Sequence, residues 1–297
     1  MTSLKKNKFI KKILAGSVAL TIAGCGGGGT SDYSPPSSAP PTSTPGQPQP
    51  PTGLQGAAVK GPVAGAQVSL YFVDPNAVDL KGELVDTGTT NASAQIEGVI
   101  IPEEIEQRDD YFQQSFLLEV TGGEVVGTGL APAVKTMKSI VTGREYSLDR
   151  AIYATPLSTL AVELADQFVK QNPQFSVQEA LTSTSLEINN SAVRNMSDQA
   201  KLAFGFGLLN TADLFKTAPY LTATGDATAA VKYRTALEAF AAIVLNVTAE
   251  TGGEAVDVLS MLADDLSDGA INGKGKNGDI PSLIAVSNLA QLVTADV

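Results

Sequence analysis

The chain contains no histidine and no tryptophan, and it has a single cysteine. Histidine is the commonest general base and metal ligand in proteins, so zinc, copper and haem sites of the usual kinds lose their ligands. Aromatic residues make up 6% of the chain, which disfavours a sugar-binding groove built on aromatic platforms, although seven Tyr and ten Phe do not exclude one. One cysteine provides no intramolecular disulfide, so the folded part must depend on its hydrophobic core.

Basic residues are also scarce, with 20 Lys and Arg against 31 Asp and Glu. Five of the lysines lie within the first twelve residues. Without those five, 15 basic residues remain against 31 acidic ones, a net charge of −16. Such a surface repels phosphate backbones, so a nucleic-acid partner is not expected. It also offers no basic patch for anionic lipids.

The N-terminus has the pattern of an export signal. The lysine-rich start is followed by an apolar run over residues 13–23. As a helix this run would be roughly 16 Å long at about 1.5 Å per residue, whereas a hydrocarbon core is about 30 Å thick. We therefore expect residues 1–24 to be a cleaved signal peptide and not a membrane span or a buried helix.

The single cysteine ends this apolar run. The string Ile22-Ala23-Gly24-Cys25 resembles the lipobox of bacterial envelope lipoproteins. The resemblance implies cleavage between Gly24 and Cys25, a diacylglyceryl thioether on Cys25, and N-acylation of the freed amine by a chain such as palmitate. Two or more acyl chains anchor a protein stably, so the lipid bilayer is the first expected partner. In lipoproteins that are retained in the inner membrane, the residue after the lipidated cysteine is usually Asp, whereas this chain has Gly26 there. By this analogy the outer membrane is favoured, with the body facing the periplasm or the surface.

Residues 25–53 comprise the lipidated cysteine and a linker. Glycines occupy positions 26–29, and eight prolines lie between Pro35 and Pro51 among Ser, Thr and Gln. A segment of this composition cannot bury a core and is typical of a partly extended spacer. We expect it to be disordered and to hold the folded body away from the membrane.

Residues 54–147 carry the signals of β structure. Apolar residues alternate with polar ones, and turn residues separate the runs. Strands are predicted at 54–59, 66–73, 83–87, 95–101 and 115–120, with an edge strand near 138–141. The strings 61–68 (GPVAGAQV) and 116–120 (FLLEV) resemble the carboxypeptidase-regulatory-like (transthyretin-like) β-sandwich. The resemblance implies an antiparallel sandwich that acts as a structural or binding module. The chain departs from it at 90–94 (TNASA), where the family usually has a Thr-Asp turn ending in glycine.

Residues 148–297 change to a helical period. Thr155 and Pro156 form a helix start, and Ser176 with Glu179 forms a capping box. Further helices are predicted over 197–215, 233–247, 258–266 and 281–293. Short connections favour an antiparallel all-α bundle, so the expected class is α+β, a β-sandwich followed by helices. With its lipobox, spacer, sandwich and the string 155–160 (TPLSTL), the chain resembles a class of bacterial envelope lipoproteins.

One polar cluster suggests a cation site. A twelve-residue loop that starts at Asp268 has Asn272 fifth, Gly273 sixth and Asp279 twelfth, as in an EF-hand, but Ala270 fails at the third position. Asp268, Asn272 and Asp279 are therefore weak calcium candidates. The alternative is a helix that ends near Gly269, followed by a solvated loop.

The leading functional hypothesis is a non-enzymatic, membrane-anchored envelope lipoprotein. It would display a module for binding, adhesion or scaffolding, with an unknown protein or surface ligand as its partner. One alternative is a lipid-tethered hydrolase or transferase. For nucleophilic catalysis without histidine the remaining route is a Ser–Lys pair, and no Ser-x-x-Lys string stands out at the start of a predicted helix. Paired carboxylates could serve a glycosidase, but spacing in the sequence does not reveal their separation in space. Another alternative is an accessory subunit of an envelope complex.

Overall fold

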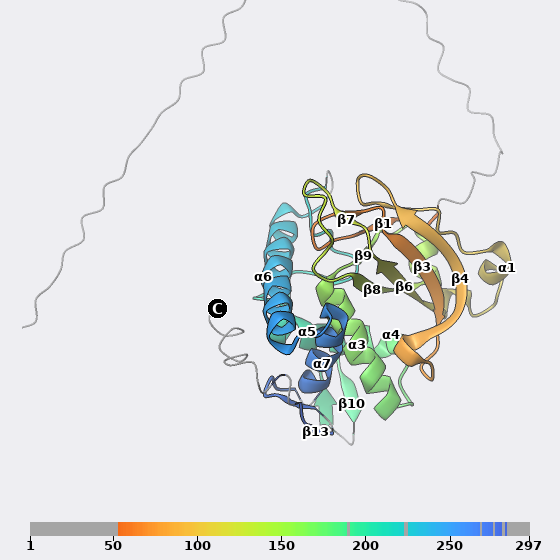
Figure 1. Cartoon of the computed structure of the whole chain (residues 1–297). Helices are drawn as coiled ribbons and strands as arrows, with labels where there is room; N and C mark the ends of the chain where they lie inside the picture. Colours follow the sequence, from red (N-terminus) through yellow and green to blue (C-terminus); the bar gives the residue numbers. More distant parts are fainter. Residues whose placement is uncertain are drawn as a thin grey trace, which may run out of the picture. The chain divides into compact units, whose positions relative to one another are not determined.

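A computed structural model describes residues 53–188, 191–222, 225–267, 269–275, 277–280 and 283 (Figure 1). These residues belong to one unit, which spans Gln49–Val297. The predicted signal peptide, the lipobox with Gly24 and Cys25, and nearly all of the linker lie outside the described residues. The helix predicted at 281–293 also lies outside them, except for Leu283.

The β region is built on a five-stranded antiparallel sheet with the strand order β5-β4-β3-β6-β8 (Figure 1). Its strands are β3 (Gln67–Val73), β4 (Lys81–Thr90), β5 (Ile96–Glu97), β6 (Ser115–Thr121) and β8 (Thr136–Thr142). Val68 and Leu70 of β3 lie opposite Val120 and Leu118 of β6, and all four are buried. The period-two pattern therefore marks a true core face.

Two short ladders stand beside this sheet. Strand β2 (Val63–Ala64) pairs antiparallel with β7 (Glu124–Val125), and β1 (Gly56–Ala58) pairs parallel with β9 (Ile152–Ala154). Gly56 has φ +151°, and a Cβ there would collide with the carbonyl oxygen of Ile152. Only glycine permits the two backbones to approach this closely.

Short helical turns connect the strands. They are η1 (Val78–Leu80), α1 (Glu103–Glu106), η2 (Tyr111–Gln113) and α2 (Gly143–Ser147). Helix α2 starts with a capping box in which Thr142 and Glu145 each bond the backbone N–H of the other. This box ends β8 and turns the chain toward β9.

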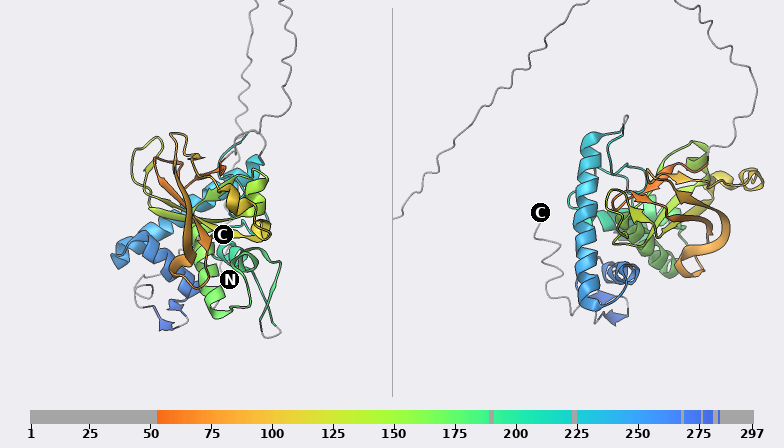
Figure 2. Two further views of the ribbon diagram at one scale, coloured as in Figure 1. Left: turned by 90° about the vertical axis from the view of Figure 1, so that its right-hand side faces the viewer. Right: turned by 45° about the horizontal axis from the view of Figure 1, so that its top comes forward.

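The longer helices are α3 (Pro156–Gln171), α4 (Val177–Thr182), α5 (Met196–Phe204), α6 (Ala227–Thr251) and α7 (Ala255–Leu266). Helix α3 contacts β8 as well as α4, α5, α6 and α7, so it joins the sheet to the other helices. Helix α6 runs along one side of the other elements (Figure 2). The caps predicted at Thr155 and Ser176 are confirmed as capping boxes, with Pro156 at the first helical position.

Two details of the predicted helical region are wrong. The helix expected over 197–215 ends at Phe204, because Gly205 and Gly207 follow and Gly207 has φ +89°. The region also contains strands, so it is not all-α. These are β9, β10 (Leu186–Ile188), β11 (Ser191–Val193), β12 (Lys274–Gly275) and β13 (Gly278–Asp279). With two or three residues each, they are too short to show a period in the sequence.

The described β and helical residues share one large hydrophobic core, which runs from Leu54 to Leu283. The β1–β9 ladder also crosses the expected boundary between residues 147 and 148. The residues on the two sides of this boundary differ in their sequence pattern, but their buried side chains belong to the same core. The α+β class is confirmed. Among the described residues, one sheet has more than two strands.

Candidate functional site

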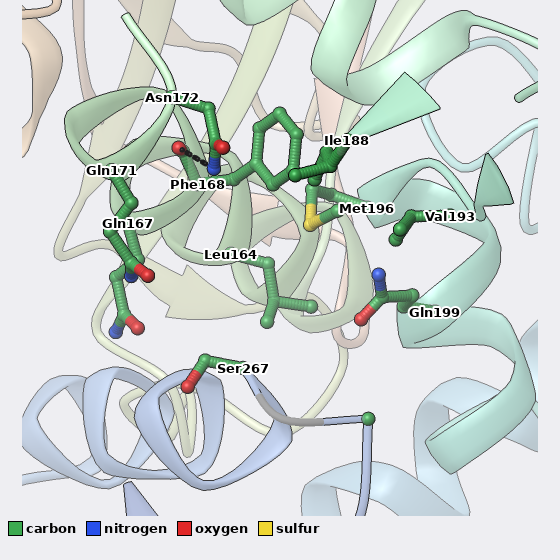
Figure 3. Close-up of a pocket in the computed structure, with 11 residues that line it drawn as sticks. Leu164, Gln167, Phe168, Gln171, Asn172, Ile188, Val193, Met196, Gln199 and Ser267 are labelled. Carbon is green, nitrogen blue, oxygen red and sulfur yellow. Dashed lines mark hydrogen bonds between the residues drawn. The ribbon is translucent and has the colours of Figure 1, made fainter. Parts of the chain in front are cut away.

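A cavity of about 450 Å³ lies among four elements that are distant in the sequence (Figure 3). Its walls come from the second half of α3, the β10–β11 hairpin, helix α5 and the residues that follow α7. Pockets that hold small molecules usually measure roughly 300–1,000 Å³. The volume is therefore suitable for a small ligand.

Half of the lining is apolar. Leu164 and Phe168 lie one turn apart on α3, and Met196 opens α5 behind the Asn195 cap. These three side chains are buried, and Ile188 and Val193 of the hairpin complete the apolar part. Figure 3 labels Phe168, Met196 and Leu164 among the side chains that line the cavity, with Leu164 near the middle of the view.

The other half consists of neutral polar side chains. They are three glutamines, one asparagine and one serine, namely Gln167, Gln171, Gln199, Asn172 and Ser267. Gln167 and Gln171 lie on one side of the cavity in Figure 3, and Gln199 lies on the opposite side. The described lining contains no ionisable side chain. The described part of the lining is thus amphipathic and carries no charge.

Internal hydrogen bonds orient three of these amides. Asn172 Nδ2 donates to the carbonyl of Phe168 at 3.0 Å, drawn as the dashed line in Figure 3. Gln199 Nε2 donates to the Arg194 carbonyl at 3.1 Å, and Gln167 Nε2 donates to that of Ser260 at 3.4 Å. Because a carbonyl only accepts, the amide nitrogen must face it. This leaves Gln167 Oε1 buried without a hydrogen-bond partner.

A second cluster of polar groups lies between the sheet and the helices. Lys138 Nζ of β8 contacts Glu163 Oε1 of α3 at 2.7 Å, and both side chains are buried. The Ser260 hydroxyl of α7 donates to Glu163 Oε2 at 3.1 Å, and Asp79 lies 3.7 Å from Lys138 Nζ. We call Lys138 and Glu163 the core ion pair.

The core ion pair bears on the Ser–Lys hypothesis. Burial disfavours the charge on Lys138, but the charges of Glu163, Asp79 and Glu119 outweigh it and raise the pKa of the ammonium above its ordinary value. A lysine that activates a serine must instead have a lowered pKa. Lys138 is therefore a structural cation at neutral pH and not a general base.

The string 155–160 is a junction of hydrogen bonds. Thr155 and Ser158 cap α3, and the Ser158 hydroxyl donates to the carbonyl of Lys138 at 2.7 Å. Thr155 Oγ1 lies 3.0 Å from the hydroxyl of Tyr233, which donates to the Leu214 carbonyl at 2.7 Å. Burial raises the pKa of Tyr233, which keeps its hydroxyl protonated as a donor. The hydroxyls of this string are thus used in holding the fold together.

The calcium candidates are partly outside the described residues. Asp268 is not described, whereas Asn272 Oδ1 accepts the backbone N–H of Lys274 at 2.9 Å and Asp279 lies opposite Lys274 in the β12–β13 pair. The buried Asp265 accepts N–H bonds from Asn272 and Lys274, both at 3.0 Å. Among the described residues, no group of three His, Cys, Asp or Glu side chains could hold a metal ion. Calcium binding stays a prediction.

The lining of the cavity could not be recognised in the sequence. Leu164 and Phe168 are two of several apolar residues in the helix that starts at Thr155 and Pro156, and the amide residues belong to no motif. The hairpin that forms one wall was not predicted at all.

Comparison of the chain with protein-family models, curated proteins and solved structures finds no match. Within the described ranges, no helix combines the length and the apolarity that crossing a membrane requires.

Proposed function

We propose that the chain is a non-enzymatic, lipid-anchored envelope protein whose folded body binds a small ligand. The observation that carries the binding role is the cavity of about 450 Å³ beside α3, with its apolar floor and neutral amide wall. A pocket that combines apolar surface with a few oriented polar groups is the usual form of a ligand site. Where the ligand is a group on a larger surface, binding it would attach the protein to that surface and so give an adhesion or scaffolding role.

The anchor is proposed from the sequence. The lipobox at 22–25 would place acyl chains on Cys25, and the spacer would hold the body at a distance from the bilayer. By the same resemblance we propose the outer membrane as the location. We also propose that the five-stranded sheet, together with the β1–β9 and β2–β7 ladders, is a variant of the carboxypeptidase-regulatory-like sandwich.

Fractionation of cells that express the full chain tests the anchor. We expect the protein in the outer-membrane fraction, and Cys25→Ser should move it to the soluble fraction. Mass spectrometry of the N-terminal peptide should find Cys25 acylated. An unmodified cysteine, or an unchanged distribution of the serine variant, would refute the anchor.

A cavity-filling variant tests the binding role. Val193 is a partly buried residue at the edge of the cavity, so Val193→Trp should occupy the space and abolish ligand binding with little loss of stability. A variant that is folded and still binds every ligand as the natural chain does would contradict the binding role of this cavity.

A further inference from the structure

Resting on this proposed function, we infer the chemical class of the ligand. The ligand is an uncharged molecule with an apolar body and at least one N–H or O–H group, which it donates to Gln167 Oε1. Three features of the cavity lead to this class: the absence of charged side chains from its described lining, the unpaired oxygen of Gln167, and its size.

The first feature is the lining. An ion that leaves water for a partly apolar cavity loses its hydration free energy. Only a counter-charge or several hydrogen bonds in the cavity can compensate for this loss. The described lining supplies no counter-charge of either sign. Carboxylates, phosphates and ammonium groups are therefore all disfavoured relative to a neutral ligand of the same shape.

The second feature is Gln167 itself. Its oxygen is buried without a partner, which is an unfavourable state for a strong acceptor. Its nitrogen is held only by a 3.4 Å bond to the Ser260 carbonyl, at the long end of the hydrogen-bond range. The last torsion of glutamine has a broad preference, so the amide can turn. A donor from the ligand would give the oxygen the partner that it lacks.

The third feature is size. A volume of about 450 Å³ equals on the order of fifteen water molecules at roughly 30 Å³ each. The apolar floor of Leu164, Phe168 and Met196 would receive the hydrocarbon part of the ligand. The amide wall would receive its polar end, so the ligand has one end of each kind.

Four probes of matched shape separate charge from donor capacity. They are 3-phenylpropionamide (neutral, donor), methyl 3-phenylpropionate (neutral, no donor), 3-phenylpropionate (anion, no donor) and 3-phenylpropylammonium (cation, donor). Binding is followed on the full chain by the NMR signal of ¹³C-labelled methionine methyl groups. Met196 lines the cavity, while Met137 and Met261 lie outside its lining and report on the fold.

We expect the amide to bind about tenfold more tightly than the methyl ester, as one added hydrogen bond allows, and more tightly than either ion. Gln167→Leu should remove the advantage of the amide and leave binding of the ester within about twofold. Gln171→Leu is the matched control, because Gln171 lies one turn further along α3 and also lines the cavity. This control should keep most of the preference.

The outcomes distinguish the two proposals. If no probe shifts the Met196 signal, or if Val193→Trp leaves the binding unchanged, the binding role of the cavity fails. If the probes bind in the cavity but the amide has no advantage, the inferred ligand class is wrong while the binding role stands. The same holds if the advantage survives in Gln167→Leu. Unchanged Met137 and Met261 signals show that a variant is folded.

Discussion

Replacing Glu163 by leucine would leave the ammonium of Lys138 buried without its closest counter-charge. The two side chains of the core ion pair are only 3% and 6% exposed, and their charged atoms lie 2.7 Å apart. Removal of one member of a buried pair costs about 3–5 kcal/mol. Asp79 remains 3.7 Å from Lys138 and is 44% exposed, so we expect the lower end, about 3 kcal/mol.

The double variant tests the physical reason. Lys138→Met with Glu163→Leu removes both charges, and we expect it to lie within about 2 kcal/mol of the natural chain and to be more stable than either single variant. Urea unfolding of the four proteins gives the coupling free energy by a double-mutant cycle. The matched control is Lys135–Glu254, an exposed pair at 3.0 Å, whose loss should cost less than about 1 kcal/mol.

The pH dependence follows from the direction of the Lys138 shift. Because its pKa in the folded protein is raised above the ordinary value of 10.5, its contribution is fully present below that pH and is lost as pH rises through the folded pKa. The natural chain should therefore lose more stability than Lys138→Met above about pH 10.5. The reasoning about the core ion pair would be refuted if Glu163→Leu or Lys138→Met lowered the free energy of unfolding by no more than the loss of the exposed Lys135–Glu254 pair does.

Two further substitutions test the junctions of the fold by the same unfolding assay. Tyr233→Phe removes the donor to the Leu214 carbonyl and the partner of Thr155, so it should cost about 1–3 kcal/mol, and a loss below 0.5 kcal/mol or so would contradict this role. Gly56→Ala places a methyl group against the Ile152 carbonyl and should cost more than about 3 kcal/mol. Gly65→Ala, at φ +68° with open space around its Cβ position, should cost only about 1–2 kcal/mol, and equal losses at the two sites would argue against the steric explanation.

Elements set by local patterns could be predicted from the sequence. The alternation over 66–73 predicted β3, and the run over 115–120 predicted β6, each to within about a residue at either end. The caps at Thr155 and Ser176 depend on residues three positions apart, so they too were visible. In each case the determining residues are neighbours in the chain.

The remainder depends on contacts between distant residues. The β1–β9 ladder pairs Ala57 with Tyr153, and no residue pattern within either strand indicates that the two strands pair. Lys138 and Glu163 meet only because α3 packs on β8. The cavity combines residues from 164 to 269, and in the sequence its glutamines are only polar positions within helical segments.

The parallel β1–β9 ladder has a mechanical consequence. Strand β1 is the first strand after residue 53, and β9 is followed directly by Thr155, the cap of α3. Tension applied to the chain before residue 53 would therefore reach the cap of α3 through this ladder, and it would reach the segment around β5 through the Leu54–Val99 hydrogen bond and the Ala57–Gln95 bridge.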